Sequence, residues 1–417
     1  MSKIDELLEE MCPDGVEFKP LWQLTTWNKK FKNVDAEKQP SVIKTKILLA
    51  NELDQLVSDS GTIKLLTTYP SSLYADDTEE VKDLIREDEL IAIPWGGNPY
   101  IHYYKGKYIT SDNRIAIVND TSILLTKFLY YYLLANHKHV ANLYRGSGIK
   151  HPNMPLLIEM EIPLPPIEIQ EEIVKILDTF TELEARKKQY AYYRNLLLSF
   201  DRAGEERERR FIEIFCKRHG IDFDCDRDLE WKTIGEVANI LDNKRKPITK
   251  AARVKGEYPY YGANGITDYV SGYIFDGTFL LIGEDGSVIT ASGNPILNWA
   301  TGKFWVNNHA HVLQSKDDGP SLRYLMYAIS VQNIENVVRG VPPKFNKTNM
   351  SLINLPIPPT EVQQLIVDTL DKFSTITENL QNGLPKEIEL HRKQYEHYRN
   401  RLLTFNKKSD DVVPNNR

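Results

Sequence analysis

The sequence is poor in the features that mark secreted and membrane proteins. Its 417 residues include only three cysteines, Cys12, Cys216 and Cys225, which are too few for a disulfide framework and are typical of a reducing compartment. No apolar run approaches the roughly 18 residues that a membrane span needs. The acidic, amphipathic start MSKIDELLEEM predicts a short helix over residues 1–14 and is unlike a signal peptide. We therefore expect a cytoplasmic protein with no membrane segment.

Positive charge is not in excess either. The chain has 52 Lys and Arg against 58 Asp and Glu, which gives a formal net charge of −6. This balance argues against a nucleic-acid binder that is basic over its whole surface, although the net charge of the whole chain does not reveal local basic patches. The length predicts two or three domains, and a hydrophobic content of 41% is enough for their cores.

One long element occurs twice. Residues 162–200 read IPLPPIEIQEEIVKILDTFTELEARKKQYAYYRNLLLSF, and residues 355–405 open with LPIPPTEVQQLIVDTLDKF and close with RKQYEHYRNRLLTF. Pro166 recurs as Pro359 and Tyr190 recurs as Tyr395, so the offset grows from 193 to 205 residues within the element. The second copy therefore carries twelve extra residues. A repeat of this length dictates the architecture before any short motif is considered.

The repeated element predicts two long amphipathic helices. Each begins with a proline pair, which suits a helix entrance because the missing N–H groups have no partner there in any case. Apolar residues then recur at helical spacing and form one stripe on each helix. The simplest partner for each stripe is the other, in an antiparallel arrangement with a globular domain at either end. We expect helix–helix packing through Ile169, Ile173, Leu177, Phe180, Val362, Ile366, Leu370 and Phe373.

The segments before the two copies also correspond, with low identity. In the first half we predict a buried helix over 125–135 and strands over 46–50, 63–67, 90–94, 107–110 and 114–118. Residues 230–234, 278–287, 304–314 and 321–330 repeat 17–21, 89–98, 108–118 and 125–134 in the same order. The sequence therefore predicts an α+β fold with two similar globular domains, separated by a pair of long antiparallel helices in a pseudo-two-fold repeat.

A basic turn recurs in both halves. Arg145-Gly146 is followed by Lys150, and Arg339-Gly340 is followed by Lys344. Lys and Arg suit contacts to DNA phosphates, and Asn, Arg and Lys suit contacts to base edges. The DNA-binding candidates are Lys29, Lys30, Lys32, Lys105, Lys107, Asn113, Arg145 and Lys150 in the first half, and Lys244, Arg245, Lys246, Lys250, Arg253, Asn264, Lys303, Asn307, Asn308, Arg339 and Lys344 in the second.

Three patterns suggest other chemistry, and each departs from what its site requires. Residues 13–19 mimic a nuclease metal site, but Asp14 and Glu17 stand too close around a glycine turn. Residues 96–100 lack one proline of an adenine methyltransferase loop and no methyl-donor loop precedes them. Residues 216–225 offer three zinc ligands where a structural site needs four. His309 and His311, on one strand face, are expected in the core or on DNA. We predict no catalytic residue and no metal site.

At the repeated element the chain resembles the specificity subunit of a type I restriction–modification system. The PLPPxExQ-type entrance, the LDxF run and the RKQYxxYRNxLL(S/T)F ending carry this resemblance in both copies. It implies a subunit without catalysis that reads a bipartite double-stranded DNA target. It also implies binding of two methyltransferase subunits and of restriction motor-nuclease subunits. S-adenosylmethionine, ATP and magnesium would be bound by those partners and none by this chain.

The resemblance divides the chain into six segments. It implies a first target recognition domain over 1–161, a conserved helical spacer over 162–203 and a charged linker over 204–229. A second recognition domain over 230–354, a second spacer over 355–406 and a flexible tail over 407–417 follow. The charged linker is expected to be a solvated helix face with ion pairs such as Glu205–Arg209 and Glu206–Arg210.

The spacer is short in this chain. TELEAR, over 181–186, stands where many members carry several TAEL-like tetrapeptides, so a short gap between the two DNA half-sites is expected. An assembly scaffold that does not read DNA, or an anti-restriction DNA mimic, remains the alternative. A mimic would gather its acidic residues on one face, whereas here they are dispersed along the chain.

Overall fold

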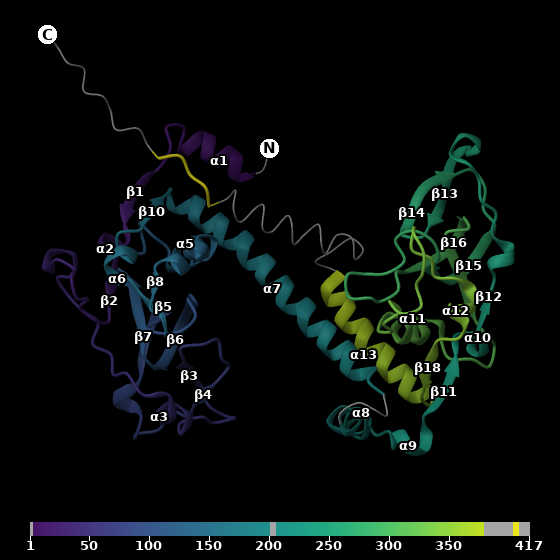
Figure 1. Cartoon of the computed structure of the whole chain (residues 1–417), viewed down its shortest axis with the longest axis horizontal. Helices are drawn as coiled ribbons and strands as arrows, with labels where there is room; N and C mark the ends of the chain where they lie inside the picture. Colours follow the sequence, from purple (N-terminus) through teal and green to yellow (C-terminus); the bar gives the residue numbers. More distant parts are fainter. Residues whose placement is uncertain (1–2, 201–205, 379–402, 408–417) are drawn as a thin grey trace, which may run out of the picture. The chain divides into compact units, whose positions relative to one another are not determined.

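The computed structural model describes residues 3–200, 206–378 and 403–407 (Figure 1). The chain divides into two compact units, the first of Met1–Glu182 with Gly383–Arg417 and the second of Leu183–Asn382. The division falls inside the longest helix, α7 (Ile167–Leu197). Within the described ranges, no helix is both long and apolar enough to cross a membrane.

The first unit is built on a six-stranded sheet. All neighbouring strands are antiparallel except β3 and β6, which are parallel. The strand order is β2 (Thr25–Trp27), β7 (Asn113–Val118), β5 (Arg86–Pro94), β6 (His102–Thr110), β3 (Ile63–Leu66) and β4 (Tyr74–Ala75). The helices are α1 (Lys3–Met11), α2 (Leu21–Leu24), α3 (Ala50–Asp54), α4 (Thr126–Ala135), α5 (His137–Asn142) and α6 (Met154–Leu157), with short 3-10 turns at Ala36–Lys38 and Lys82–Leu84.

The second unit repeats this topology. Its six-stranded sheet has the order β12 (Ala238–Ile240), β17 (Ala310–Ser315), β15 (Phe275–Gly283), β16 (Leu297–Val306), β13 (Lys255–Gly262) and β14 (Gly265–Val270), with β13 and β16 parallel. The helices are α8 (Glu206–Arg218), α9 (Cys225–Asp228), α10 (Ile234–Val237), α11 (Leu322–Ser330), α12 (Lys347–Ser351) and α13 (Thr360–Glu378), with 3-10 turns at Asp242–Lys244 and Lys250–Ala252. The predicted repeat of two α+β units is confirmed.

Each long helix is entered from a two-stranded sheet. In the first unit β1 (Glu17–Pro20) pairs with β10 (Glu161–Leu164), which leads into α7. In the second unit β11 (Glu230–Thr233) pairs with β18 (Asn354–Ile357), which leads into α13. Residues 17–21 and 230–234 therefore correspond in structure as well as in sequence.

One predicted strand is wrong. Residues 46–50 form only an isolated bridge at Ile47, and α3 begins at Ala50. The Glu52 side chain accepts the Leu49 N–H at 2.6 Å, which satisfies a backbone donor at the helix start and favours a helix over a strand. The other four predicted strands overlap β3, β5, β6 and β7, and the predicted helix over 125–135 overlaps α4.

The stripes of the two long helices do not pack against each other as we expected. Ile169, Ile173 and Leu177 are fully buried in the core of the first unit, beside α4. Val362, Ile366 and Leu370 are fully buried in the core of the second unit, beside α11. The expectation fails because each helix starts directly after a strand of its own unit, where an apolar surface is already within reach.

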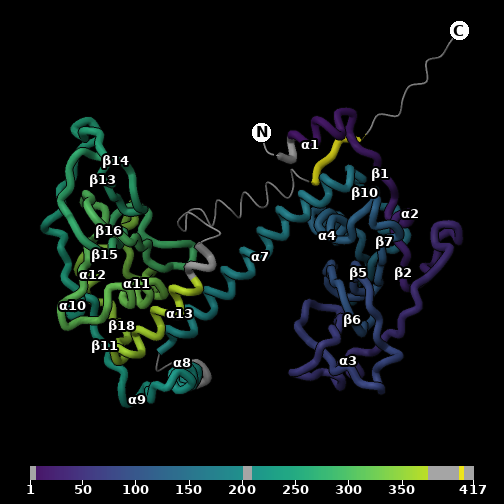
Figure 2. The backbone as a smooth tube through the Cα atoms, turned by 180° about the vertical axis from the view of Figure 1, so that it is seen from behind, coloured from purple at the N-terminus to yellow at the C-terminus, as the bar shows by residue number. Residues whose placement is uncertain are grey.

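A contact between the two helices exists further along them. In the second unit the second half of α7 and α13 lie side by side and antiparallel, in both views (Figures 1 and 2). Tyr193 and Phe373 stack there with ring centroids 5.4 Å apart and planes at 17°. Phe373, one of the eight packing candidates, thus contacts the other long helix, and Phe180 is half-buried on α7.

A polar clamp holds each long helix to the helix beneath it. In the first unit the Asp178 carboxylate accepts the Tyr131 hydroxyl at 2.6 Å and pairs with Lys127 at 2.7 Å. In the second unit the Asp371 carboxylate accepts the Tyr327 hydroxyl and pairs with Arg323 at 2.8 Å. These contacts occupy corresponding places in the two copies and fix the helix against rotation about its axis.

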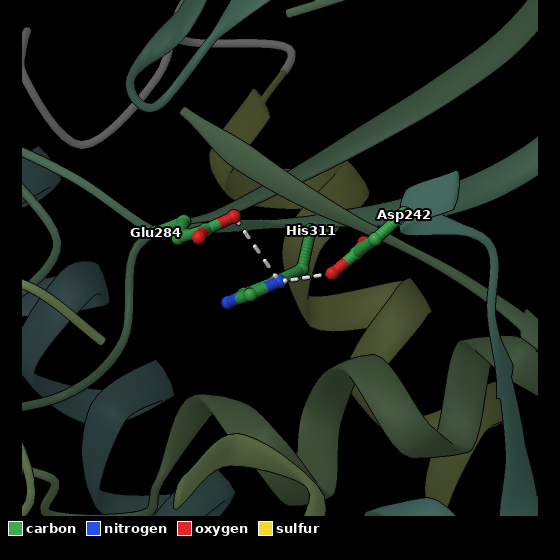
Figure 3. Close-up of side chains that lie close together, drawn as sticks. All are labelled: Asp242, Glu284 and His311. Atoms are coloured by element: carbon green, nitrogen blue, oxygen red, sulfur yellow. Dashed lines mark hydrogen bonds and ion pairs between the residues drawn. The ribbon is translucent and has the colours of Figure 1, made fainter. Parts of the chain in front are cut away.

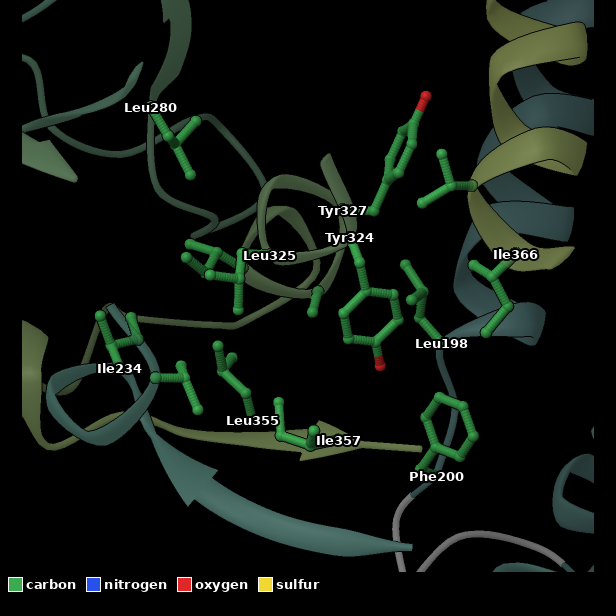
Figure 4. Close-up of a cluster of buried hydrophobic side chains, with 14 of the residues drawn as sticks. Leu198, Phe200, Ile234, Leu280, Tyr324, Leu325, Tyr327, Leu355, Ile357 and Ile366 are labelled. Atoms are coloured by element: carbon green, nitrogen blue, oxygen red, sulfur yellow. The ribbon is translucent and has the colours of Figure 1, made fainter. Parts of the chain in front are cut away.

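The end of each repeated element is inserted into a core. Leu197, Leu198 and Phe200 lie in the core of the second unit, where Figure 4 shows Leu198 and Phe200 near Tyr324 and Ile366. The matching end of the second copy lies in the first unit, where Leu403 is buried and the Phe405 ring is 6.2 Å from that of Phe128.

Further contacts hold this second end in place. The Asn406 carbonyl accepts the Val16 N–H at 2.9 Å, and Lys407 pairs with Glu161 at 2.7 Å. The first unit therefore closes its core with residues from the far end of the sequence.

The region expected to be a charged linker is also part of a core. Ile212 and Cys216 on α8 are fully buried in the second unit, and Cys225 on α9 packs beside them. The expectation of a solvated helix holds for one face only, because α8 carries an apolar face as well. Glu205 lies outside the described residues, and Arg209 pairs instead with Asp226 at 2.5 Å.

Leu403→Ala should destabilise the first unit by about 2 to 4 kcal/mol, because it leaves a cavity in a closed core. Hydrogen exchange during denaturant unfolding checks this, and the loss of protection should be confined to the first unit. Leu156→Ala, at an exposed position of the same unit, should change stability by less than about 0.5 kcal/mol. Equal effects of the two changes would contradict the inserted end.

Candidate nucleic-acid interface

Three loops meet at one end of the sheet in the first unit. They are residues 95–98 after β5, residues 111–113 between β6 and β7, and residues 145–151 across the hairpin of β8 (Tyr144–Arg145) and β9 (His151–Pro152). The Trp95 N–H donates to the Asp112 carbonyl at 3.0 Å, and the Gly97 N–H donates to the Lys150 carbonyl at 3.0 Å. We call this set the three-loop platform.

The second unit has the same platform, made of residues 284–287, 307–309 and 339–345. The Glu284 N–H donates to the His309 carbonyl at 2.8 Å, and the Gly286 N–H donates to the Pro343 carbonyl at 3.0 Å. Corresponding loops are thus joined by corresponding backbone hydrogen bonds. Because those bonds do not depend on side chains, the exposed side chains of the platform are free to differ between the units.

An exposed arginine opens the hairpin of each platform. Arg145 pairs with His151 in the strand ladder, while Arg339 and Lys344 exchange two backbone hydrogen bonds of 3.0 and 2.8 Å. The Arg145 guanidinium donates to the Asn142 carbonyl and that of Arg339 donates to the Val338 carbonyl. Among the described residues neither guanidinium has a carboxylate partner, so both keep charge available for an anion.

Further predicted residues lie on or beside the platforms. Lys29 Nζ is 3.6 Å from the Asp112 carboxylate in the first unit. Exposed side chains that belong to the platforms or to the segments beside them are those of Lys30, Lys32, Lys150, Lys244, Lys246, Asn308 and Lys344. The structure therefore brings together the basic segment after β2 or β12 and the repeated basic turn.

Other candidates lie elsewhere on the sheets. Lys105 and Lys107, on β6, pair with Glu89 at 2.9 Å and with Asp77 at 2.7 Å. Three more belong to the β13–β16 side of the second sheet: Lys250 in a 3-10 turn, exposed Asn264 between β13 and β14, and Lys303, whose Nζ is 4.7 Å from the centre of the Tyr273 ring. Asn264 borders the second platform, since a Cβ on Gly283 would lie 3.2 Å from the carbonyl oxygen of the neighbouring Ala263. The contacts described for the other four residues do not involve platform loops.

Four candidates hold the fold together, so their prediction as DNA contacts is corrected. Asn113 is fully buried, and its amide donates to the Leu66 and Thr67 carbonyls. Asn307 is buried and accepts the His309 N–H at 2.8 Å. Arg253 pairs with Asp268 at 3.1 Å, and Arg245 is bound inside a charged cluster. Residue type alone predicted a surface role, whereas burial gives each group partners within the protein.

The charged cluster lies under the second platform (Figure 3). His311 is fully buried, with Nδ1 2.7 Å from Asp242 Oδ2 and 3.5 Å from Glu284 Oε2, and with Nε2 2.8 Å from the Phe345 carbonyl. Arg245 Nη1 is 2.6 Å from Glu284 Oε2 and 2.7 Å from the Ala310 carbonyl. These groups tie all three loops to the sheet.

The cluster is the one group of potential metal ligands in the described residues, but its chemistry does not favour a metal. The Arg245 guanidinium already supplies positive charge to both carboxylates, and both ring nitrogens of His311 have partners. Burial raises the pKa of Asp242, yet the His311 hydrogen bond and the charges of His311 and Arg245 outweigh it and hold that pKa below its ordinary value.

Only the spacing of His309 and His311 hints at this cluster in the sequence. His311 was expected in the core or on DNA together with His309, and the core position is confirmed for His311. His309 precedes β17 and is exposed, 3.6 Å from the Asp285 carboxylate, so the two histidines do not share a strand face.

The first platform has a different support. The Arg114 guanidinium lies 4.0 Å from the centre of the Trp95 ring and donates to the Asp112 carboxylate at 2.8 Å. Arg114 and Trp95 occupy the places of His311 and Glu284 in the strand register, since Ile93 faces Arg114 and Ile282 faces His311. The sequence did not reveal this support, because neither residue belongs to a repeated motif.

In the described part of the chain, residues of the three rejected patterns have partners or surroundings of their own. Glu17 and Lys19 form an ion pair of 3.3 Å on β1. Cys216 and Cys225 are buried thiols, and burial raises the pKa of Cys216 to about 11 and that of Cys225 to about 12. The His219 ring is bound to the Phe215 carbonyl at 2.8 Å. Residues 96–98 of the methyltransferase-like pattern belong to the first platform, where the Gly97 N–H donates to the Lys150 carbonyl.

The chain matches one protein family twice. The model of the type I restriction modification DNA specificity domain matches residues 26–191 and again residues 227–390. The chain belongs to this family. The two matches include both platforms, so the repeated geometry coincides with the repeated specificity domain.

Relatives carry the same family description. A putative type I restriction enzyme specificity subunit of Haemophilus influenzae is 42% identical over 183 residues, which cover 43% of this chain and 47% of that protein. The chain thus spans about half the length of this relative. A type I restriction enzyme specificity subunit of Escherichia coli is 26% identical over 440 residues, which cover 98% of each chain. The crystal structure of a type I S subunit from M. genitalium aligns over 93% of this chain and 96% of that chain, with 16% identity and a TM-score of 0.48.

Replacing Arg145 or Arg339 by Gln should weaken DNA binding by this specificity-family chain and lower the slope of log affinity against log salt by about 1, because one phosphate contact is lost. Binding titrations at several salt concentrations check both values. Lys105→Gln is the matched control, since Lys105 is equally cationic but lies off the platform beside Glu89. An unchanged slope for both arginine variants would remove them from the interface.

Asp242→Asn should make the second unit less stable at neutral pH and less sensitive to acid. Because the folded pKa of Asp242 lies below its ordinary value of 3.8, its contribution is full above that value and is lost as the pH falls through the folded pKa. Denaturant unfolding between neutral and acid pH checks the direction. An identical pH dependence for wild type and variant would contradict the role of the cluster.

Proposed function

We propose that this chain is the DNA specificity subunit of a type I restriction–modification complex and reads a bipartite duplex target, one half-site per unit. One observation carries the proposal: the same three-loop platform occurs once in each unit, and the arginine at the start of its hairpin has no carboxylate partner among the residues that the structure describes. Cations at corresponding places suit phosphates, which both half-sites share, whereas the differing exposed side chains suit different bases.

The proposal assigns the chemistry to partner subunits. Two methyltransferase subunits would bind this chain through its long helices, and motor-nuclease subunits would join that core. The partners would bind S-adenosylmethionine, ATP and magnesium, and this chain would supply only sequence reading and positioning. The buried cluster of Asp242, Glu284 and His311 is consistent with this division, because its groups are already bound to one another and to Arg245.

The direct test is to sequence modified adenines in cells that carry this chain with its methyltransferase partner. A single bipartite motif should be modified, and gel shifts of the assembled complex should prefer fragments that contain it. If the complex shows no sequence preference, the chain is an assembly scaffold or a DNA mimic, and the proposal fails.

Inserting a TELT-like tetrapeptide after Leu183 should lengthen the preferred gap between the half-sites without changing either half-site. Leu183 lies inside α7, so four residues add about one helical turn, roughly 6 Å. Sequencing of modified adenines gives both the gap and the half-sites in one measurement. Altered half-sites with an unchanged gap would show that α7 does not set the spacing.

A further inference from the structure

Both platform hairpins carry an exposed β-branched apolar side chain. Ile149 is 69% exposed and Val341 is 100% exposed. Single apolar residues on a surface are ordinary. These two differ because each follows the exposed arginine of its hairpin within four residues, in each of two units whose identity is otherwise low.

The backbone presents these two side chains in a fixed way. Gly146 has a φ of 137°, and a Cβ there would lie 2.7 Å from the Ile149 carbonyl oxygen, so only glycine allows the close turn. The Ile149 Cγ2 lies over Gly96, at 3.0 Å from the place of a Cβ on that residue. In the second hairpin Pro342 and Pro343 follow Val341 and restrict the chain through their fixed φ. Little conformational freedom remains to be lost on binding.

We call the Ile149 and Val341 side chains the apolar tips. The charges beside the tips indicate what kind of partner binds over them. Arg145 and Lys150 flank Ile149, and Arg339 and Lys344 flank Val341, with all four cations exposed. Cations on both sides of an apolar tip complement a surface with phosphates on both sides of an apolar group. Duplex DNA offers such a group in the major groove, the C5 methyl of thymine. A valine side chain ends at Cγ and is short for opening a base step, so contact with a base edge is the mode that both tips can share.

We propose that Ile149 and Val341 are specificity-determining residues, each of which contacts the C5 methyl of a thymine in its half-site. The inference rests on the proposed function and adds to it the chemical group that each platform reads. Arg145 and Arg339 then position the tips above the bases by binding phosphates of the DNA backbone. The tips discriminate thymine from other bases by an apolar contact, which salt does not weaken.

Replacing single thymines by deoxyuridine tests the proposal, because it removes one methyl group and keeps the base pair. The probes are duplexes with the motif found by sequencing modified adenines, and the protein is this chain assembled with its methyltransferase subunits. One replacement in each half-site should weaken wild-type binding about threefold to tenfold, as expected for one buried methyl group. Ile149→Ser should bind thymine and uracil probes equally in one half-site only, and Val341→Ser should do so in the other.

Exposed apolar residues away from the platforms provide matched controls. Leu49→Ser in the first unit and Val254→Ser in the second, at positions 67% and 68% exposed, should keep the wild-type ratio of thymine to uracil binding. The proposal is overturned if no replacement affects wild-type binding, or if the two tip variants keep the wild-type ratio. Weaker assembly with the methyltransferase subunits at an unchanged ratio also overturns it, because a protein then covers the tips.

Failure of the underlying function gives a different result. In that case the wild-type complex binds the motif no better than an unrelated duplex, before any thymine is replaced.

Discussion

Burial of one apolar stripe of each long helix in its own unit is the interaction on which the rest of the molecule depends. Ile169, Ile173 and Leu177 anchor the start of α7 in the first unit, and Val362, Ile366 and Leu370 anchor α13 in the second. The clamps at Asp178 and Asp371 then fix the rotation of each helix. Corresponding strands, β10 and β18, lead directly into α7 and α13. The loops of each sheet therefore have a defined place relative to the long helix of their unit.

The platforms show how one fold supports two different surfaces. Backbone hydrogen bonds join the three loops in the same way in both units. Beneath them the first unit uses Arg114 stacked on Trp95, and the second uses a network of Asp242, Arg245, Glu284 and His311. In each support the charged groups are paired with one another or with the backbone. A platform can therefore rest on either kind of support without leaving a buried polar group unpaired. The loops can therefore change in sequence while their positions stay constant.

Much of this architecture can be predicted from the sequence, because the repeat and the strand patterns are local signals. The two α+β units, four of the five strands predicted for the first unit and the repeated Arg-Gly turns follow from these signals. The partner of each apolar stripe does not, because a stripe can be buried by any apolar surface and its spacing does not say which. The prediction of Asn113 and Arg245 as DNA contacts is wrong for a related reason: an amide or guanidinium suits a base edge and a buried carbonyl equally well.

The inserted end near Phe405 has a consequence for how the protein is made. The second unit, from Leu183 to Asn382, uses only residues that are close together in synthesis. The first unit takes Leu403 and Phe405 into its core, so that core is complete only after those residues have emerged from the ribosome. Domains generally fold from the N-terminus onward during synthesis, whereas here the N-terminal unit is the last to have all of its residues available. A nascent chain that stops early therefore exposes an unfinished apolar core to the cell's proteases and chaperones.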